Sequence, residues 1–198
     1  MSPPRAIPRL LAAGLAACLA TGAAARPARA EDLPARNQAL LLLRVLVYDR
    51  NLKERAGDAV RVAVVYRSGD ASSEAERDAL MAAYQEVARE VVAQGLPVKV
   101  EALAWRDAAD FAARLGQRRF AAVHAGRGVA AVAEELARAA RKSQSLTFAP
   151  AREMVSAGLA VGLVFRGERA GLVVNLGAAR AEGAELDPAL LQLAEVLP

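Results

Sequence analysis

Apolar residues fall into short segments along the chain. Segments with the apolar spacing of a strand alternate with segments that have the apolar spacing of a helix. Residues 61–66 (RVAVVY) and 120–124 (FAAVH) are nearly continuous apolar runs, whereas 98–103 alternates apolar with charged positions. Short runs of this kind, bounded by glycine or polar residues, are typical of strands. Between them, residues 73–93 and 107–116 carry apolar side chains three or four positions apart, as one face of a helix does. The pattern predicts strands that alternate with helices.

Further segments extend this alternation. A leucine-rich run, Asn37–Tyr48, has the spacing of a helix, residues 129–141 predict another helix, and residues 145–148 predict a short strand. Strands separated by helices of this length are joined by crossovers, and they form a parallel sheet with helices on both faces.

The helix predicted after the strand at 61–66 has a recognisable start. Ser73 and Glu76 have the spacing of a capping box, in which the two side chains bond the free backbone N–H groups of the first turn. Gly95 follows the predicted end near Ala93 as a stop signal.

The C-terminal part has a different pattern. Two apolar runs, Leu159–Phe165 and Gly171–Leu176, flank a charged turn that contains glycine, which predicts an antiparallel hairpin. A small-residue helical stretch at 177–181 follows, and Asp187 and Pro188 suit the N-cap and first position of a last helix. That helix is expected to carry Leu190, Leu191, Leu193 and Val196. The predicted fold class is α/β, a mainly parallel sheet with helices on both faces plus a C-terminal antiparallel hairpin and closing helix.

This C-terminal arrangement resembles that of a known family. The hairpin, the VNL–xAA junction after it and the final LLxLAxVL resemble the signature of the YfiR-like family, most specifically over Phe120–Pro198. Members are small periplasmic proteins, typically linked to control of a membrane diguanylate cyclase. The resemblance implies a non-enzymatic regulator that binds the sensor part of such a cyclase, and it implies a homodimer. Relatives follow the first helix with Trp-Pro, whereas this chain has Asp49-Arg50-Asn51-Leu52.

The N-terminus has the features of an export signal. Arg5 and Arg9 give a positive start, Leu10–Ala25 is a run of small and apolar residues, and Ala28–Ala30 offers a cleavage site before Glu31. The run is too short and too rich in alanine for a membrane span, which needs about 20 strongly apolar residues. We expect a periplasmic product whose single domain is residues 31–198.

Cys18 gives an alternative to this cleavage. Leu15–Cys18 has the form of a lipobox, so the mature protein would be a lipoprotein anchored to the membrane through lipidated Cys18. It is the single cysteine of the chain, and the domain therefore has no intramolecular disulfide to form.

Charge and composition argue against nucleic acid as a partner. The leader holds four of the 26 basic residues and no acidic residue, so 22 basic and 22 acidic residues remain in the domain. The domain thus lacks the basic surplus that binds phosphate backbones. Aromatic residues, which stack on bases, make up only 4% of the chain.

His124 and the Gly126-Arg127-Gly128 sequence form the strongest candidate binding site. They lie at a predicted strand-to-helix junction, and the carboxyl ends of parallel strands are where open α/β sheets bind ligands. A small anionic ligand at this turn is one interpretation, because a helix N-terminus attracts anions. A tight turn explains both glycines equally well, and a single histidine on a strand is usually packed in the core.

Two other residues have alternative interpretations. Trp105 is either a contact for a partner or part of the edge of the core. Asn175 either contributes to binding or bonds backbone where a strand passes into a helix.

We expect neither a catalytic set nor a cofactor. One histidine and no GxSxG motif leave no nucleophile–base pair, and the carboxylates Glu182, Glu185 and Asp187 are expected on polar faces or at caps. No EF-hand spacing is present, so no metal site is predicted. Two hypotheses remain: the regulator of a membrane signalling protein, and a periplasmic small-ligand-binding protein that serves a transporter or sensor kinase.

Overall fold

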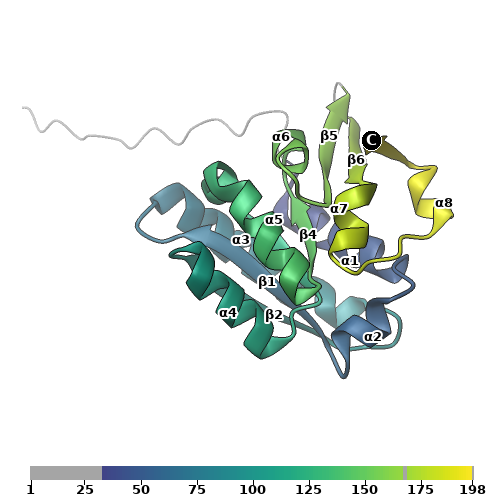
Figure 1. The fold of residues 1–198 in the computed structure, drawn as a ribbon, viewed down its shortest axis with the longest axis horizontal. Helices are drawn as coiled ribbons and strands as arrows, with labels where there is room; N and C mark the ends of the chain where they lie inside the picture. Colours follow the sequence, from purple (N-terminus) through teal and green to yellow (C-terminus); the bar gives the residue numbers. More distant parts are fainter. Residues whose placement is uncertain (1–32, 167–168, 198) are drawn as a thin grey trace, which may run out of the picture.

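The computed structural model describes residues 33–166 and 169–197. The predicted leader and its Cys18 lie outside these residues. The described chain forms one seven-stranded sheet with helices on both faces (Figure 1). The elements in chain order are α1 (Ala35–Val47), α2 (Leu52–Ala56), β1 (Val60–Arg67), α3 (Ala71–Glu90), β2 (Val98–Trp105), α4 (Ala108–Arg118), β3 (Ala122–Ala125), the 3₁₀ helix η1 (Arg127–Val132), α5 (Ala133–Ser143), β4 (Leu146–Ala149), α6 (Arg152–Ser156), β5 (Val161–Arg166), β6 (Arg169–Asn175), α7 (Leu176–Ala181), α8 (Pro188–Leu191) and β7 (Ala194–Leu197).

The strand order confirms the predicted fold class. The sheet has the order β2-β1-β3-β4-β5-β6-β7, and the strands from β2 to β5 are all parallel. β6 runs antiparallel to β5 and forms the expected hairpin, and β7 then pairs in parallel with β6.

The sheet separates two hydrophobic cores. Successive strand residues point to opposite faces, so Val62 and Val64 of β1 belong to the core that includes residues of α1, α3 and α8. Ala63 and Val65 belong to the other core, which includes residues of α4, α5 and α6. Both faces of the central strands are buried, which explains why these strands appear in the sequence as continuous apolar runs.

Helix α3 starts earlier than predicted, and the expected capping box is wrong. Its N-cap is Asp70, whose side chain accepts hydrogen bonds from the backbone N–H groups of Ser72 and Ser73. An Asp at this position bonds two free N–H groups of the first turn. The side chains of Ser73 and Glu76 therefore remain available for contacts outside the helix, described below.

The C-terminal segment forms the predicted closing helix, but only over the four residues of α8. Asp187 caps it and Pro188 occupies its first turn, as expected. Leu193 and Val196 lie outside the helix, because residues 194–197 pair with β6 as strand β7. The spacing of leucines in the sequence does not distinguish this short strand from a continued helix.

A buried ion pair holds the loop where relatives have Trp-Pro. The Asp49 carboxylate is fully buried and pairs with Arg55, whose side chain is only 6% exposed. Asp49 Oδ1 also accepts hydrogen bonds from the backbone N–H groups of Asn51 at 3.0 Å and Glu185 at 2.9 Å. The pair thus ties the end of α1 to the segment between α7 and α8.

Arg55 extends this network to the sheet. Its Nη1 donates hydrogen bonds to the carbonyl oxygens of Ala121, before β3, at 2.7 Å and of Gln144, before β4, at 2.9 Å. A single guanidinium therefore joins Asp49 to two segments that are distant in sequence, and each of its bonds strengthens in the low dielectric of the interior.

The Asp49–Arg55 pair gives a first prediction. Arg55→Met leaves the Asp49 carboxylate buried without its cation, and we expect the free energy of unfolding to fall by about 3–5 kcal/mol. Urea denaturation measures this loss. Arg50→Met, which removes a guanidinium from an exposed pair with Asp187, is the matched control and should cost much less. Equal losses of stability in the two variants would contradict the conclusion that the Asp49–Arg55 pair is a buried structural contact.

Candidate functional site

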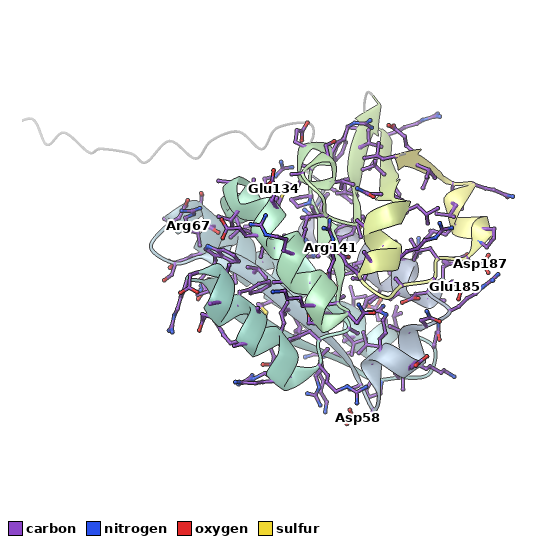
Figure 2. The ribbon with its side chains drawn as sticks, in the orientation of Figure 1. Asp58, Arg67, Glu134, Arg141, Glu185 and Asp187 are labelled. Atoms are coloured by element: carbon purple, nitrogen blue, oxygen red, sulfur yellow. The ribbon has the colours of Figure 1, made fainter. Side chains whose placement is uncertain are left out.

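The candidate loop Gly126–Gly128 lies at the topological switch point of the sheet. β1 and β3 are neighbours, and β1 leads into α3 on one face whereas β3 leads through η1 into α5 on the other face. The carboxyl ends of two such strands normally leave a crevice for a ligand. Arg67 marks this end of β1, and Figure 2 shows it on the opposite side of the molecule from Asp58, which precedes the start of β1.

The first half of the loop is bonded to β1 and α3. The N–H of Gly126 donates to the carbonyl oxygen of Val65 at 2.9 Å, and the N–H of Arg127 donates to Oε2 of Glu76 at 2.8 Å. The Glu76 carboxylate thus occupies the place next to the loop N–H groups where an anionic ligand would bind.

The second half of the loop is held by Ser73 and Arg67. Ser73 is buried, and its Oγ accepts a hydrogen bond from the N–H of Arg67 at 2.9 Å. Arg67 Nε in turn donates to the carbonyl oxygen of Gly128 at 2.9 Å. Ser73 and Glu76, which the sequence predicts to form a capping box, instead join α3 to the switch point.

This close approach explains both glycines. A Cβ on Gly126 would lie 2.9 Å from Glu76 Oε2 and 3.1 Å from the Val65 carbonyl oxygen, and a Cβ on Gly128 would lie 2.2 Å from Ser73 Oγ. These distances are shorter than normal van der Waals contacts. The protein's own side chains therefore fill the crevice at this point.

His124 lies inside the protein rather than in the loop. Its ring is fully buried, with Nδ1 2.8 Å from the Tyr84 hydroxyl and an edge-on contact to Phe148 at 5.0 Å between ring centroids. Burial lowers the pKa of His124 to about 3, so the imidazole is neutral near pH 7. Nε2 has no hydrogen-bond partner in the described part of the chain.

Trp105 and Asn175 lie at opposite edges of the sheet. Trp105 is half-buried at the end of β2, opposite Arg67 in β1, and it packs on Phe111 with ring centroids 5.4 Å apart. Asn175 ends β6, which runs the other way, and its Oδ1 accepts a hydrogen bond from the N–H of Ala178 at 2.9 Å as the N-cap of α7. Trp105 therefore shares the carboxyl edge with the candidate loop, whereas Asn175 does not.

A small cavity lies beside Arg127 at the carboxyl edge. Its volume is about 230 Å³, below the roughly 300 Å³ at which ordinary ligand pockets begin. The lining residues come from the loop after β3, the segment of α6 and strand β5: Arg127, Pro150, Ala151, Arg152, Glu153, Leu163, Val164 and Phe165.

A larger cavity of about 710 Å³ lies at the opposite, amino edge, where the sequence predicts no site. Arg55 lines it together with Arg119, Lys142 and Arg180, which lie at or just beyond the C-terminal ends of α4, α5 and α7. Cations at helix C-termini complement the helix dipoles, so these side chains stabilise the helices without a bound anion.

Glu182 is buried beside this edge, contrary to its predicted place on a polar face. Its carboxylate accepts hydrogen bonds from the Thr147 N–H at 2.8 Å and from Thr147 Oγ1 at 2.9 Å. Burial raises the pKa of Glu182 to about 8, although the bonds from Thr147 and the charges of Arg141 and Arg55 oppose this shift. Sequence patterns do not reveal it, because Glu182 is one of several acidic residues in a polar stretch.

In the described part of the chain, no three His, Cys, Asp or Glu side chains gather into a group that could hold a metal ion. Within residues 33–166 and 169–197, no helix has both the length and the hydropathy needed to cross a bilayer.

Comparisons with known proteins identify relatives of this chain. A family model described as YfiR/HmsC-like matches residues 37–195. No curated protein sequence matches the chain.

Solved structures share the fold at low identity. A conserved domain protein from Vibrio cholerae is 20% identical, with a TM-score of 0.59 over 83% of this chain and 60% of that one. An ABC domain from Streptococcus pneumonia in complex with L-Trp is 15% identical, with a TM-score of 0.56 over 83% of this chain and 62% of that one. A substrate binding protein with adhesive properties from Clostridium difficile is 14% identical, with a TM-score of 0.51 over 74% of this chain and 57% of that one. The chain thus spans about three fifths of each of these structures.

Gly128→Ala tests the contact between the loop and α3. The added methyl group meets Ser73 at 2.2 Å, and we expect the free energy of unfolding to fall by about 1–3 kcal/mol in urea denaturation. Gly116→Ala in α4 meets no atom within 4 Å and should not destabilise the protein. If Gly128→Ala were as stable as this control, the inference that the loop packs closely against Ser73 would be wrong.

Glu182 makes the free energy of unfolding depend on pH, and its raised pKa determines the direction of that dependence. In the unfolded chain this carboxyl ionises near its ordinary pKa of 4.5, whereas in the folded protein it keeps its proton up to about pH 8. Its contribution to stability is therefore complete below pH 4.5 and is lost as the pH rises to 8. His124 has the opposite effect, but only below its ordinary pKa of 6.5.

Between pH 6.5 and 8 the free energy of unfolding should therefore fall by about 2 kcal/mol through Glu182. Glu182→Gln removes this loss, which urea denaturation at the two pH values would measure. An equal fall in the variant would show that another group causes it.

Proposed function

Because the chain belongs to the YfiR/HmsC-like family, we propose that it is an exported, non-enzymatic regulator that binds a membrane signalling protein and restrains it. A diguanylate cyclase of the inner membrane is the partner we propose, and the sensor part of that enzyme is the region bound. The protein would act in the periplasm, either as a soluble domain or anchored through Cys18.

The filled switch point is the observation that most supports a protein partner. In an open α/β sheet this position would hold a small ligand, but here Glu76 and Ser73 contact the loop Gly126–Gly128 directly. His124, the one histidine, is buried with Tyr84 and does not face the surface. These features favour recognition through the outer surface over chemistry in a pocket.

The mechanism we propose is a shift in the partner's conformations. A regulator that binds the inactive conformer of a cyclase more tightly than the active one increases the inactive population. The shift equals the ratio of the two affinities, so a roughly 100-fold preference changes the equilibrium by about 100-fold at saturation. The regulator needs only a surface that fits one conformer.

A second candidate is a small-ligand-binding protein that serves a transporter or a sensor kinase. The cavity beside Arg127 at the carboxyl edge favours it, because that edge is where ligands bind in such folds. At about 230 Å³ the cavity has room only for a small molecule. A compound that strongly raises the Tm of the purified protein would favour this candidate.

Deleting the gene and measuring cellular cyclic di-GMP tests the proposed function. We expect the level to rise, because the restrained cyclase is released, and to return when the full gene is supplied. A copy without residues 1–30 is the matched control and should not restore the level, since it lacks the export signal. An unchanged level after deletion would exclude the cyclase as partner.

A further inference from the structure

Strand β2 forms one edge of the sheet and has an unused row of backbone groups. Among the described residues its ladder is formed with β1 alone, over the eight residues Val98–Trp105. The N–H of Val60 donates to the carbonyl oxygen of Pro97, and backbone groups alternate in direction along a strand. The N–H and C=O groups of Val98, Val100 and Ala102 therefore point away from β1, toward the free edge.

The side chains between these positions carry opposite charges. Lys99 and Glu101 point to the same face because they are two residues apart. Lys99 is exposed and lies next to Arg61 across the β1–β2 ladder, which places two cations side by side. Arg61 lies 3.7 Å from Asp58 and Glu101 pairs with Arg118, whereas no carboxylate of the described chain pairs with Lys99.

We propose that β2 pairs antiparallel with β2 of a second copy of this chain, with the two-fold axis at Val100. This pairing joins the two sheets edge to edge. It gives a surface to the homodimer that the family resemblance implies, and it does not depend on which signalling protein is bound.

The register follows from backbone direction and charge. Only residues with outward backbone groups can form hydrogen-bonded pairs across the new edge, so Val98, Val100 and Ala102 must face one another. Pairing Val98 with Val100 would put Lys99 opposite Lys99, and pairing Val100 with Ala102 would put Glu101 opposite Glu101. Like charges directly opposite destabilise a sheet.

Centring the pair on Val100 avoids both conflicts. Val100 then faces Val100, Val98 faces Ala102, and each Lys99 faces Glu101 of the second copy. Lys99 and Glu101 occupy the non-hydrogen-bonded positions, where opposite Cα atoms are only about 4.5 Å apart and side chains interact most closely. The cation beside Arg61 thus gains a carboxylate partner on its other side.

Sedimentation velocity of the purified protein over a range of concentrations tests this pairing. We expect the wild type to form dimers. Lys99→Glu puts two carboxylates opposite each other at both symmetric sites, and Glu101→Lys puts two ammonium groups opposite each other at the same sites. We expect each variant alone to dimerise at least about tenfold more weakly, since two attractive pairs become repulsive.

Mixing the two variants is the sharper measurement. In a mixed dimer every carboxylate of one chain at these positions faces an ammonium group of the other, so dimers should reappear in the mixture. Their return would distinguish the proposed register from a loss caused by the Arg118 pair or by misfolding of either variant.

Ala102→Pro provides a variant without a charge change. In the monomer this N–H points to the free edge, where proline is tolerated, but in the dimer it donates to Val98 of the second copy. We expect this variant to fold correctly and to dimerise more weakly than the wild type. A wild type that stays monomeric, with Lys99 only keeping the edge unpaired, would overturn the proposal. Single variants that dimerise like the wild type, or a mixture that stays monomeric, would overturn it as well. None of these results involves the cyclase, which the cyclic di-GMP measurement tests separately.

Discussion

The direct contact between α3 and the loop after β3 determines what this fold can do. A doubly wound sheet separates its crossover helices at the switch point, and the gap between them is where such folds usually bind ligands. Here two glycines let the loop Gly126–Gly128 approach α3 so closely that Glu76 and Ser73 take the place of a ligand. The Glu76 carboxylate gives the N–H of Arg127 the negative partner that an anionic ligand would supply. This arrangement supports the proposal that the protein recognises its partner through its outer surface.

Polar groups buried near the opposite edge hold the remaining segments in place. Asp49 and Arg55 link the end of α1, the starts of β3 and β4 and the segment before α8, and Glu182 bonds Thr147 of β4. Removing one partner would leave a charge or a hydrogen-bond donor unpaired in the interior. These contacts therefore fix how the end of α1 and the segment after α7 lie against the sheet. The segment that Asp49 binds lies between α7 and α8, so it connects the hairpin to the edge strand β7 along the chain.

The sequence predicted the elements well where their period is simple. The continuous apolar runs of β1 and β3, the hairpin and the capping residue Asp187 all appear in the structure as expected. The start of α3 was misplaced because Asp70 and Ser73 are both good caps, and local spacing does not rank them. Strand β7 was missed because four residues with leucine and valine fit a helix turn or a strand equally well.

The site was harder to predict than the fold because its key contacts join distant segments. The sequence identified Gly126 and Gly128, but the reason for them lies in Ser73 and Glu76, about fifty residues earlier. Asp49, Arg55 and Glu182 carry no local sign of burial, since each is one of several charged residues in its segment. A strand edge such as β2 is visible in sequence as a strand, but its position at the edge follows only from the topology.

Reconstitution in membranes measures whether binding of this protein alone restrains a diguanylate cyclase. The purified protein would be titrated into membranes that contain a candidate inner-membrane diguanylate cyclase of the same organism, while the rate of cyclic di-GMP synthesis is followed. We expect a saturable decrease in this rate that reaches its limit at a fixed ratio of regulator to cyclase, with no small molecule added. A rate that stays constant at every concentration of the regulator, or that falls only when a small ligand is supplied, would contradict this expectation.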